Sequence, residues 1–582
     1  MKNISLRELA HARSGEKGKD SNITVVAYDV KDFPLLAEVV TIDAVRALYG
    51  PITKGNITRY EAPRIGALNF VLEDVIEGGR SRTLAFEESG KALSSLMLTM
   101  TVKVPEDFQL PQRQPEFSSL PDLPSAGTKR VRLGSATGWA RDRFEPAEAL
   151  VKEGDIDYLC FDSMSEVTMS AAQVTRLAGE SAVPYDPYLE ARLSPILRDC
   201  KNKGIRIITN QGWLDPVAAA DKVVRLAREQ GVTDLKVAAV SGGLLTDKIA
   251  DLGLPFLEDG EPIASRRGDI VSAEAYMGAA GIVRALQDGA DVVITTRIAD
   301  GCLYLAPLVH EFGWSFDDHH AIAKGMIIGH LLECGTQISG GYFADPGFKE
   351  VPNLFDVGNP IADVSEDRVV IHKLPHSGGL ITEATCKEQL LYEVQDPTTY
   401  YCPDVIADLT KVSFRQCGAD QVEVIIDNAG RPRTPTLKAL IGLKEGFATE
   451  EMVLFAGPGA MDRAELTKDL LKKRFKRVNL KADEIRMDYV GLNSVHREAT
   501  PHSEMTPYEV VLRIAVKTAE RSEAEKLRRE IDPLAVNGPS ATGKWATMSP
   551  GSRIRPVIGL NSALVPRELV PTVVTLKSFE CM

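Results

Sequence analysis

The chain has 582 residues and a formal net charge of −13, and 44% of its residues are hydrophobic and 26% charged. Several domains are expected at this length, and the ordinary apolar share supplies a large core, so intrinsic disorder and a single small fold are excluded. The acidic excess repels phosphate backbones, so we expect no nucleic-acid partner.

Signals for export and for membrane insertion are missing from the sequence. The first twenty residues, MKNISLRELAHARSGEKGKD, are charged from the second position and lack the apolar run of about 7–15 residues that a secretory signal needs. The longest apolar stretches fall short of the ~20 residues that cross a bilayer, so no membrane partner is expected. The eight cysteines form no CxxC pair, which is typical of reduced thiols. We therefore expect a cytoplasmic protein.

Residues 1–105 predict a small α+β domain, because short helical and extended patterns alternate along them. The expected strands lie at 22–28, 56–60 and 100–104, and the expected helices at 41–48, 68–76 and 89–97. A proline-rich stretch at 106–128 then favours an extended linker, since proline is excluded from helix interiors and central strands.

Residues 129–403 predict an α/β core domain with a parallel sheet. Five apolar runs of strand length are separated by helical segments, a pattern that is typical of a sheet covered by helices on both faces. The runs lie at 131–134, 158–161, 205–209, 235–240 and 292–296.

Beyond residue 404 the sequence changes to β-branched strands and turns, which predicts a second α+β lobe at 404–582. Strands are expected at 422–426, 437–443, 452–455 and 572–576, and helices at 463–474 and 519–530.

Polar residues follow several of the five apolar runs. Ligands of parallel sheets bind beyond the carboxyl ends of the strands, and this rule selects Gly134-Ser135, Asp162-Ser163, Asn210-Gln211, Ser241 and Thr296-Arg297. The segments that follow these runs add the charged residues Asp142, Arg143, Glu166 and Asp300 as candidates. Arg297, three residues before Asp300, suits an anchor for a carboxylate or phosphate beside a proton acceptor. A purely structural ion pair explains this spacing equally well, as it does for Asp142 and Arg143 at a predicted helix start.

The segment GHLLECGTQISGGYFAD places His330, Glu333 and Cys334 at positions i, i+3 and i+4, so a helix would put all three on one face. Such a set supplies either an acid/base pair or part of a metal site. Zinc signatures of the His-Glu-x-x-His type need a second histidine, which is missing here. A hydrogen-bonded core is the commoner use of a lone histidine on a helix, so no metal is expected.

No cofactor is expected from the motifs. Residues 538–544 read GPSATGK and satisfy GxxxxGK, but Trp545 stands where a magnesium-binding Ser or Thr is required. No GxGxxG follows an apolar strand. The GxSxG elbow is also absent, so a serine hydrolase is not supported.

Several longer segments, in this order, resemble the acyclic terpene utilisation (AtuA-like) family over about residues 131–570. They are GSATGWARDRFEPA, GDIDYLCFDSMSE, GIRIITNQG, SAEAYMGAAGIVRALQDGADVVITTRIAD, LAPLVHEFGW, GHLLECGTQISGGYFADPG, EQLLYEVQDP, YCPDV and LVPRELV. Residues 1–105, with HARSGEKGKDSNI, ALNFVLEDVIEGG and SGKAL, resemble the small ferredoxin-like domain that accompanies this family.

The resemblance implies a metabolic enzyme or pathway component that acts on branched acids or their coenzyme A thioesters. The sequence departs from the usual family pattern where it reads Arg141-Asp142-Arg143 and Ser241-Gly242-Gly243, and also at Asp162–Glu166. These departures are consistent with a different substrate. The resemblance also implies a small domain that packs on the core, either covering the site or building an oligomer contact, and we expect a homo-oligomer.

We expect a lyase, more narrowly a hydratase or dehydratase, acting on a small branched carboxylic acid or its acyl-CoA thioester. Adding or removing water next to a carbonyl group requires an acid, a base and a positive group that stabilises the enolate-like oxygen. The expected proton-transfer groups are Glu166, Asp300 and the pair His330 and Glu333. The expected substrate-binding groups are Asp142, Arg143, Asp162, Asn210 and Arg297. An isomerase would use the same parts, and a non-catalytic acyl-thioester scaffold and a metal-dependent hydrolase at His330 remain alternatives.

Overall fold

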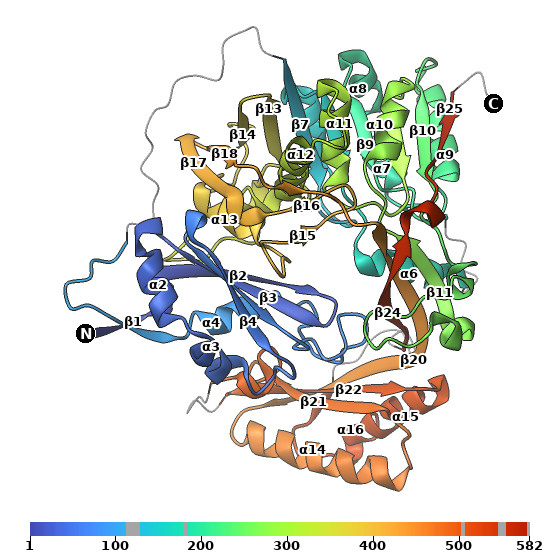
Figure 1. The fold of residues 1–582 in the computed structure, drawn as a ribbon. Helices are drawn as coiled ribbons and strands as arrows, with labels where there is room; N and C mark the ends of the chain where they lie inside the picture. The colour runs from blue at the N-terminus through green and yellow to red at the C-terminus, as the bar shows by residue number, and fades with distance from the viewer. Residues whose placement is uncertain (112–128, 178–182, 502–506, 545–553, 579–582) are drawn as a thin grey trace.

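The computed structural model describes residues 1–111, 129–177, 183–501, 507–544 and 554–578. The largest sheet has ten strands, of which the five in the middle are mutually parallel and the outer ones antiparallel (Figure 1). In spatial order they are β17 (Val412–Gly418), β18 (Gln421–Ile426), β14 (Val369–Lys373), β13 (Pro360–Ser365), β7 (Arg130–Thr137), β8 (Tyr158–Phe161), β9 (Arg206–Thr209), β12 (Val292–Thr295), β10 (Val237–Ser241) and β25 (Val573–Lys577). The five parallel strands arise from the five apolar runs, so the predicted parallel sheet is confirmed.

Helices cover both faces of this sheet, and the alternation of side chains along each strand explains why. In β8, Leu159 and Phe161 join one hydrophobic cluster, whereas Tyr158 and Cys160 join another on the opposite face. The first cluster includes residues of α5 (Glu145–Glu153), α7 (Leu189–Leu193), α8 (Leu197–Lys203) and α9 (Pro216–Glu229). The second includes residues of α10 (Ala280–Gln287), α11 (Cys302–Phe312), α12 (His319–Leu332) and α13 (Glu383–Leu390).

A second sheet is built around β20 (Thr436–Ala456), a strand of 21 residues. It pairs with β11 (Ile270–Ala275) and β24 (Arg555–Pro566) near its start, and with β22 (Glu509–Thr518) and β23 (Gly543–Lys544) further on, while β21 (Glu484–Val490) flanks β22. The helices α14 (Ala460–Arg477), α15 (Arg521–Ile531) and α16 (Leu534–Asn537) contribute to the core of this sheet. Because β17, β18 and β25 join the ten-stranded sheet, the division expected at residue 404 does not coincide with a boundary between sheets.

The N-terminal region forms a four-stranded antiparallel sheet in the order β2 (Ala10–Lys17), β3 (Asp20–Ala27), β5 (Ala67–Leu72) and β4 (Ile57–Ala62). A separate pair, β1 (Lys2–Ser5) and β6 (Thr101–Val104), and the helices α1 (Leu6–Leu9), α2 (Phe33–Val39), α3 (Ile42–Tyr49) and α4 (Leu93–Met97) complete it. The predicted mixed α/β class, with a small N-terminal α+β unit, is confirmed. Most of the predicted linker, residues 112–128, lies outside the described residues.

One local prediction in this region was wrong. The apolar stretch expected as a helix at 68–76 is largely strand β5. This strand is buried on both faces, so its apolar residues show no repeat that distinguishes a strand from a helix. Arg13 and Lys17 lie in the second half of β2, and the turn follows at Gly18, with φ +66°.

The sheet of the N-terminal region packs against the chain segment that follows α13. Nδ2 of Asn22 donates to the carbonyl of Leu391 at 2.8 Å, and Nδ2 of Asn69 donates to the carbonyls of Val394 and Gln395 at 2.9 and 2.8 Å. The N-terminal region therefore fixes residues 391–395 from outside the core domain.

Two shorter elements complete the described secondary structure near the centre of the molecule. A small sheet pairs β15 (Tyr400–Tyr401), β16 (Ile406–Ala407) and β19 (Gly430–Arg431), and α6 (Glu166–Leu177) follows β8. Across the described ranges, none of the helices combines the length and the apolar character that crossing a bilayer demands.

Candidate functional site

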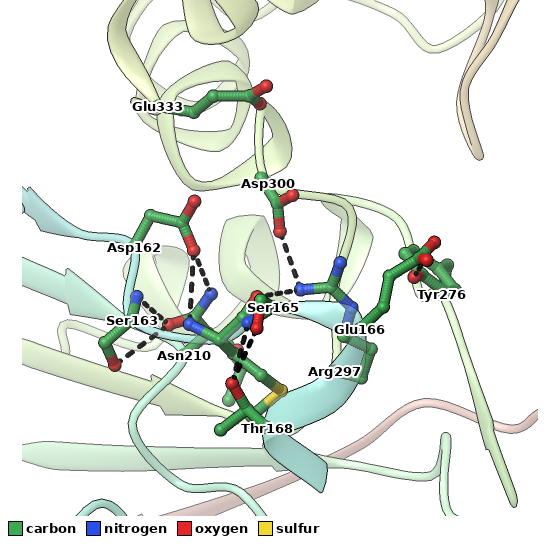
Figure 2. A network of polar contacts seen from close by, with 12 residues as sticks. Asp162, Ser163, Ser165, Glu166, Thr168, Asn210, Tyr276, Arg297, Asp300 and Glu333 are labelled. Atoms are coloured by element: carbon green, nitrogen blue, oxygen red, sulfur yellow. Dashed lines mark hydrogen bonds and ion pairs between the residues drawn. The ribbon is translucent and has the colours of Figure 1, made fainter. Parts of the chain in front are cut away.

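The carboxyl ends of three parallel strands bring Asp162, Asn210 and Arg297 to one edge of the ten-stranded sheet. Nδ2 of Asn210 donates to Oδ1 of Asp162 at 2.7 Å, and Oδ1 of Asn210 accepts the backbone N–H of Ser163 at 2.8 Å. Asn210 therefore holds the turn after β8 through both ends of its amide (Figure 2). Strand ends at one sheet edge are the expected place for a ligand.

Arg297 is the buried cation of this edge, with 4% of its surface exposed. Its Nη1 donates to Oδ1 of Asp300 at 2.8 Å and also to the carbonyl of Met164. The guanidinium lies over the ring of Tyr276, 4.3 Å from the ring centre. These contacts fix the plane of the guanidinium, and the neighbouring carboxylates further raise the already high pKa of Arg297.

Three carboxyl groups, those of Asp162, Asp300 and Glu333, gather on one side of this network (Figure 2). Burial raises the pKa of Asp162 well above its usual value, and the charges of Asp300 and Glu333 add to this effect. Burial also raises the pKa of Asp300 to about 6, with Glu333 adding to the rise and Arg297 and Lys17 opposing it. Burial thus favours the protonated form of Asp162, whereas Asp300, with a pKa of about 6, is ionised at neutral pH, and such a pair can supply an acid together with a base.

Glu166, the first residue of α6, lies on the other side of Arg297. Its Oε1 accepts hydrogen bonds from the hydroxyl of Tyr276 at 3.0 Å and from Nζ of Lys438 at 3.2 Å. Burial alone would raise the pKa of Glu166, but Lys438, Lys17 and Arg297 outweigh burial and lower it. Glu166 therefore stays a carboxylate, which favours a role in holding cations over the proton transfer expected from the sequence.

His330 is buried behind Glu333 rather than facing the strand ends. Its Nε2 lies 3.0 Å from the carbonyl of Leu390 and must donate to it, so Nδ1 is the atom that meets Oε1 of Glu333 at 3.0 Å. The hydroxyl of Tyr400 lies 3.4 Å from the same Nδ1. His330 therefore contacts both Glu333 and Tyr400 through Nδ1. Within the described ranges no three His, Cys, Asp or Glu side chains are placed to hold a metal ion.

Asp142 and Arg143 make their contacts away from this network. The Asp142 carboxylate accepts the backbone N–H groups of Gly138 and Arg143 at 3.1 and 2.8 Å, which closes the loop after β7. The Arg143 guanidinium donates to the carbonyls of Phe355 and Val357. Both side chains thus bind backbone groups, and their contacts among the described residues include no ion pair between Asp142 and Arg143.

Sequence reasoning missed Lys17, Tyr276 and Lys438 as members of this network. Tyr276 follows β11, Lys438 lies on β20, and Lys17 ends β2 in the N-terminal region. Tyr276 and Lys438 contact Glu166 directly, whereas Lys17 binds Glu393 and acts on Glu166 through its charge. The sequence features that could have indicated these residues are the cationic segment Arg13–Gly18 and the tyrosine within SAEAYMG. Neither feature shows which side chain the residue would contact.

Comparison with protein families gives two matches. The family model described as acyclic terpene utilisation family protein AtuA matches residues 131–576, and that of the AtuA ferredoxin-like domain matches residues 4–103. The family resemblance, with the small domain N-terminal to the larger one, is therefore confirmed. No curated protein and no solved structure matches the chain.

Proposed function

The chain belongs to the acyclic terpene utilisation family AtuA, and on this premise we propose that it is a hydro-lyase acting on a small branched carboxylic acid or its acyl-CoA thioester. Membership of the family implies a role in acyclic terpene utilisation. The observation that carries the finer proposal is the group of carboxyls at the strand ends beside the buried Arg297, where burial raises the pKa of Asp162 well above its usual value and that of Asp300 to about 6.

In the dehydration direction, the Asp300 carboxylate removes the proton next to the substrate carbonyl. The electron pair of the broken C–H bond forms the new C=C bond as the hydroxyl leaves from the next carbon, and protonated Asp162 donates the proton that releases this hydroxyl as water. Arg297 stabilises the negative charge that develops on the carbonyl oxygen. Hydration runs through the same groups in reverse, so no redox step is required.

Solvent access supports a catalyst over a scaffold. A scaffold would leave these charges in dry ion pairs, whereas the side chains of Asp300 and Glu166 keep 29% and 20% of their surface exposed although both lie next to Arg297. Water can therefore reach both carboxylates. His330 does not share this access, since only 3% of its side chain is exposed.

The test is incubation of the purified protein in ¹⁸O-labelled water with branched unsaturated and 3-hydroxy acids, each as the free acid and as the coenzyme A thioester. We expect one member of the panel to gain or lose one water, with label in the hydrated product. The double variant Asp162→Asn, Asp300→Asn serves as the inactive control. A product of unchanged mass would identify an isomerase instead, and no turnover of the whole panel would contradict the proposal.

A further inference from the structure

The end of α12 packs against the segment that carries Asp300. Gly329 of α12 approaches Gly301 so closely that a Cβ at Gly329 would overlap the backbone of Gly301. Asp300 precedes Gly301, and Glu333 follows Gly329 by one helical turn, with its backbone N–H donating to the Gly329 carbonyl at 2.8 Å. The backbone of Glu333 is therefore tied to a helix that touches the residue next to Asp300.

The residue after Glu333 packs against the segment that carries Asp162. A Cβ at Gly138 would overlap the backbone of Cys334. The neighbouring Thr137, which ends β7, donates from Oγ1 to the carbonyl of Asp162 at 2.8 Å. Backbone contacts thus place Glu333 between the segments of the two aspartates, and Figure 2 shows its carboxyl group on the same side as theirs.

The Glu333 carboxylate takes its direction from His330. Among the described residues its one hydrogen bond joins Oε1 to Nδ1 of His330, at 3.0 Å. The two side chains are 12% and 3% exposed, respectively. A largely buried carboxylate with a single partner is oriented by that partner. The mechanism proposed above makes no other use of His330.

The other ring nitrogen of His330 is bound to the end of α13. Nε2 donates to the carbonyl of Leu390, the last residue of that helix, at 3.0 Å. Nε2 of Gln389 donates in turn to the carbonyl of His330 at 3.1 Å. Both ring nitrogens are therefore in use, so the imidazole cannot turn without losing its contacts to Glu333 and to α13.

The ferredoxin-like domain binds the same turn of α13. Nδ2 of Asn22 donates to the carbonyl of Leu391 at 2.8 Å, and Nδ1 of His11 meets Oε1 of Glu388 at 2.6 Å. Asn22, His11 and Glu388 are all at most 4% exposed. Residues 388–391 are therefore held by the small domain as well as by His330.

We propose that His330 is a positioning residue that directs the Glu333 carboxylate into the strand-end site, and that the ferredoxin-like domain holds His330 in place through the last turn of α13. The inference rests on the proposed function for the role of that site. The charge of Glu333 has an effect there, since it adds to burial in raising the pKa of Asp162 and of Asp300. The small domain then supports the site through a series of hydrogen bonds.

The first test is NMR spectroscopy of the full chain with ¹⁵N-labelled histidine, in which the two ring nitrogens of His330 report on its two contacts. Signals of His330 are assigned by their absence in His330→Asn, and the other histidine signals show that each variant is folded. We expect Glu333→Gln to shift the Nδ1 signal. Asn22→Ala should speed solvent exchange of the Nε2 proton by about tenfold, because it loosens the Leu390 carbonyl.

The matched control for Asn22→Ala is Arg64→Met. Arg64 also joins the small domain to the core domain, but its Nη1 binds Oδ2 of Asp427, at 2.5 Å, instead of α13. The Nε2 proton of His330 should exchange in Arg64→Met as in the wild type. Equal exchange in Asn22→Ala and the wild type would overturn the inference.

The second test is kinetic and separates the two contacts of His330. The amide nitrogen of asparagine takes the place of Nδ1, and that of glutamine takes the place of Nε2. His330→Gln should therefore lower kcat by about tenfold with KM unchanged, because it gives up the contact to Glu333. His330→Asn keeps that contact and should lose less. Equal kcat values in the two variants would contradict the positioning role.

The spectra require no turnover, so the inference and the proposed function can fail separately. Shifted His330 signals in Glu333→Gln and Asn22→Ala, without turnover of any acid, would remove the hydro-lyase and leave the placement of His330 standing. Turnover by the wild type, with His330 signals unchanged in both variants, would do the opposite.

Discussion

Asp300 accepts a hydrogen bond of 2.8 Å from Nη1 of Arg297, which precedes it by three residues at the end of β12. The cation opposes the effect of burial and leaves the pKa of Asp300 at about 6. A carboxyl group with this pKa is ionised at neutral pH and still basic enough to remove a proton, as general base catalysis requires.

Asp300→Asn removes the proposed base without changing the size of the side chain. We expect kcat to fall by about 10²–10⁴-fold, which is the usual contribution of a positioned acid or base. Wild-type activity should fall as the pH drops through about 6, because protonation removes the base, and the variant's residual activity should lack this decline. The pH profile of kcat/KM measures both effects.

The control for that variant is Asp288→Asn, which removes the surface ion pair with Arg284 on α10. It should retain wild-type kinetics. Equal losses in the two variants would indicate a general effect of removing a carboxylate and would remove Asp300 from the mechanism.

Glu274→Gln should change how stability depends on pH. Glu274 lies on β11 with 2% of its surface exposed, and its Oε1 has no hydrogen-bond partner among the described residues. Burial raises its pKa from 4.5 to about 8, with Arg297 opposing the rise. The folded state therefore keeps a proton that the unfolded state loses, so wild-type stability falls between pH 4.5 and 8, at most by about 1.4 kcal/mol per pH unit.

The glutamine has no proton to lose, so Glu274→Gln should gain stability relative to the wild type as the pH rises from 5 to 8. Urea unfolding at several pH values measures this difference. Glu229→Gln, at an exposed position on α9, is the control and should follow the wild type. A constant difference between Glu274→Gln and the wild type would contradict the raised pKa.

Glu388→Gln should weaken the contact between the ferredoxin-like domain and α13. Oε1 of Glu388 meets Nδ1 of His11 at 2.6 Å and Nζ of Lys349 at 2.8 Å in a buried cluster. Although burial raises the pKa of this carboxyl, Lys349 and His11 outweigh burial and hold it at about 2. Removing one partner of a buried ion pair leaves the other unpaired, so the free energy of unfolding should fall by about 3–5 kcal/mol.

The same carboxylate gives a pH signature. Its folded pKa lies below the unfolded value of 4.5, so it stabilises the protein above pH 4.5, and this contribution is lost as the pH falls toward 2. Glu388→Gln should not show this loss. Glu190→Gln, which breaks a surface pair with Lys222, serves as the control. Equal stability of the two variants at pH 7 would show that the cluster does not hold the domains together.

Gly15→Ala tests the close approach of β2 to the core domain. A Cβ at this position would lie 2.6 Å from Cγ of Glu393 and 2.7 Å from Cε2 of Tyr392. We expect a loss of about 1–3 kcal/mol in the free energy of unfolding, because residues 392–393 must move. Gly268→Ala, where the added Cβ meets open space, should be neutral. Thermal unfolding of the two variants should therefore differ, and equal Tm values would contradict the tight contact.

The sequence predicts the large sheet well because its parallel strands are buried on both faces. Such strands appear as short apolar runs, and the rule on strand ends then places Asp162, Asn210 and Arg297 at one edge. The same property misleads at residues 68–76, where an apolar run without a period predicts a helix, whereas residues 67–72 form strand β5.

Partners of the site residues are harder to predict, because they depend on how sheets pack. Lys17 and Lys438 are 421 positions apart in the chain, yet the charges of both lower the pKa of Glu166. No repeating pattern in the sequence indicates that residues so far apart influence the same side chain. Asp142 and Arg143 show the opposite error, in which residues predicted to bind a ligand instead bind backbone groups of neighbouring loops.

Strand β20 carries the lysine beside Glu166 near its start and, beyond a shift in its pairing with β24 between Lys444 and Phe447, reaches the part of the sheet covered by α14 and α15. Since neighbouring residues of a strand point to opposite faces, adding or deleting one residue within it would turn Lys438 away from the site or displace the far helices from their sheet. The length of this strand should therefore tolerate no drift over evolution, even where its individual side chains are free to change.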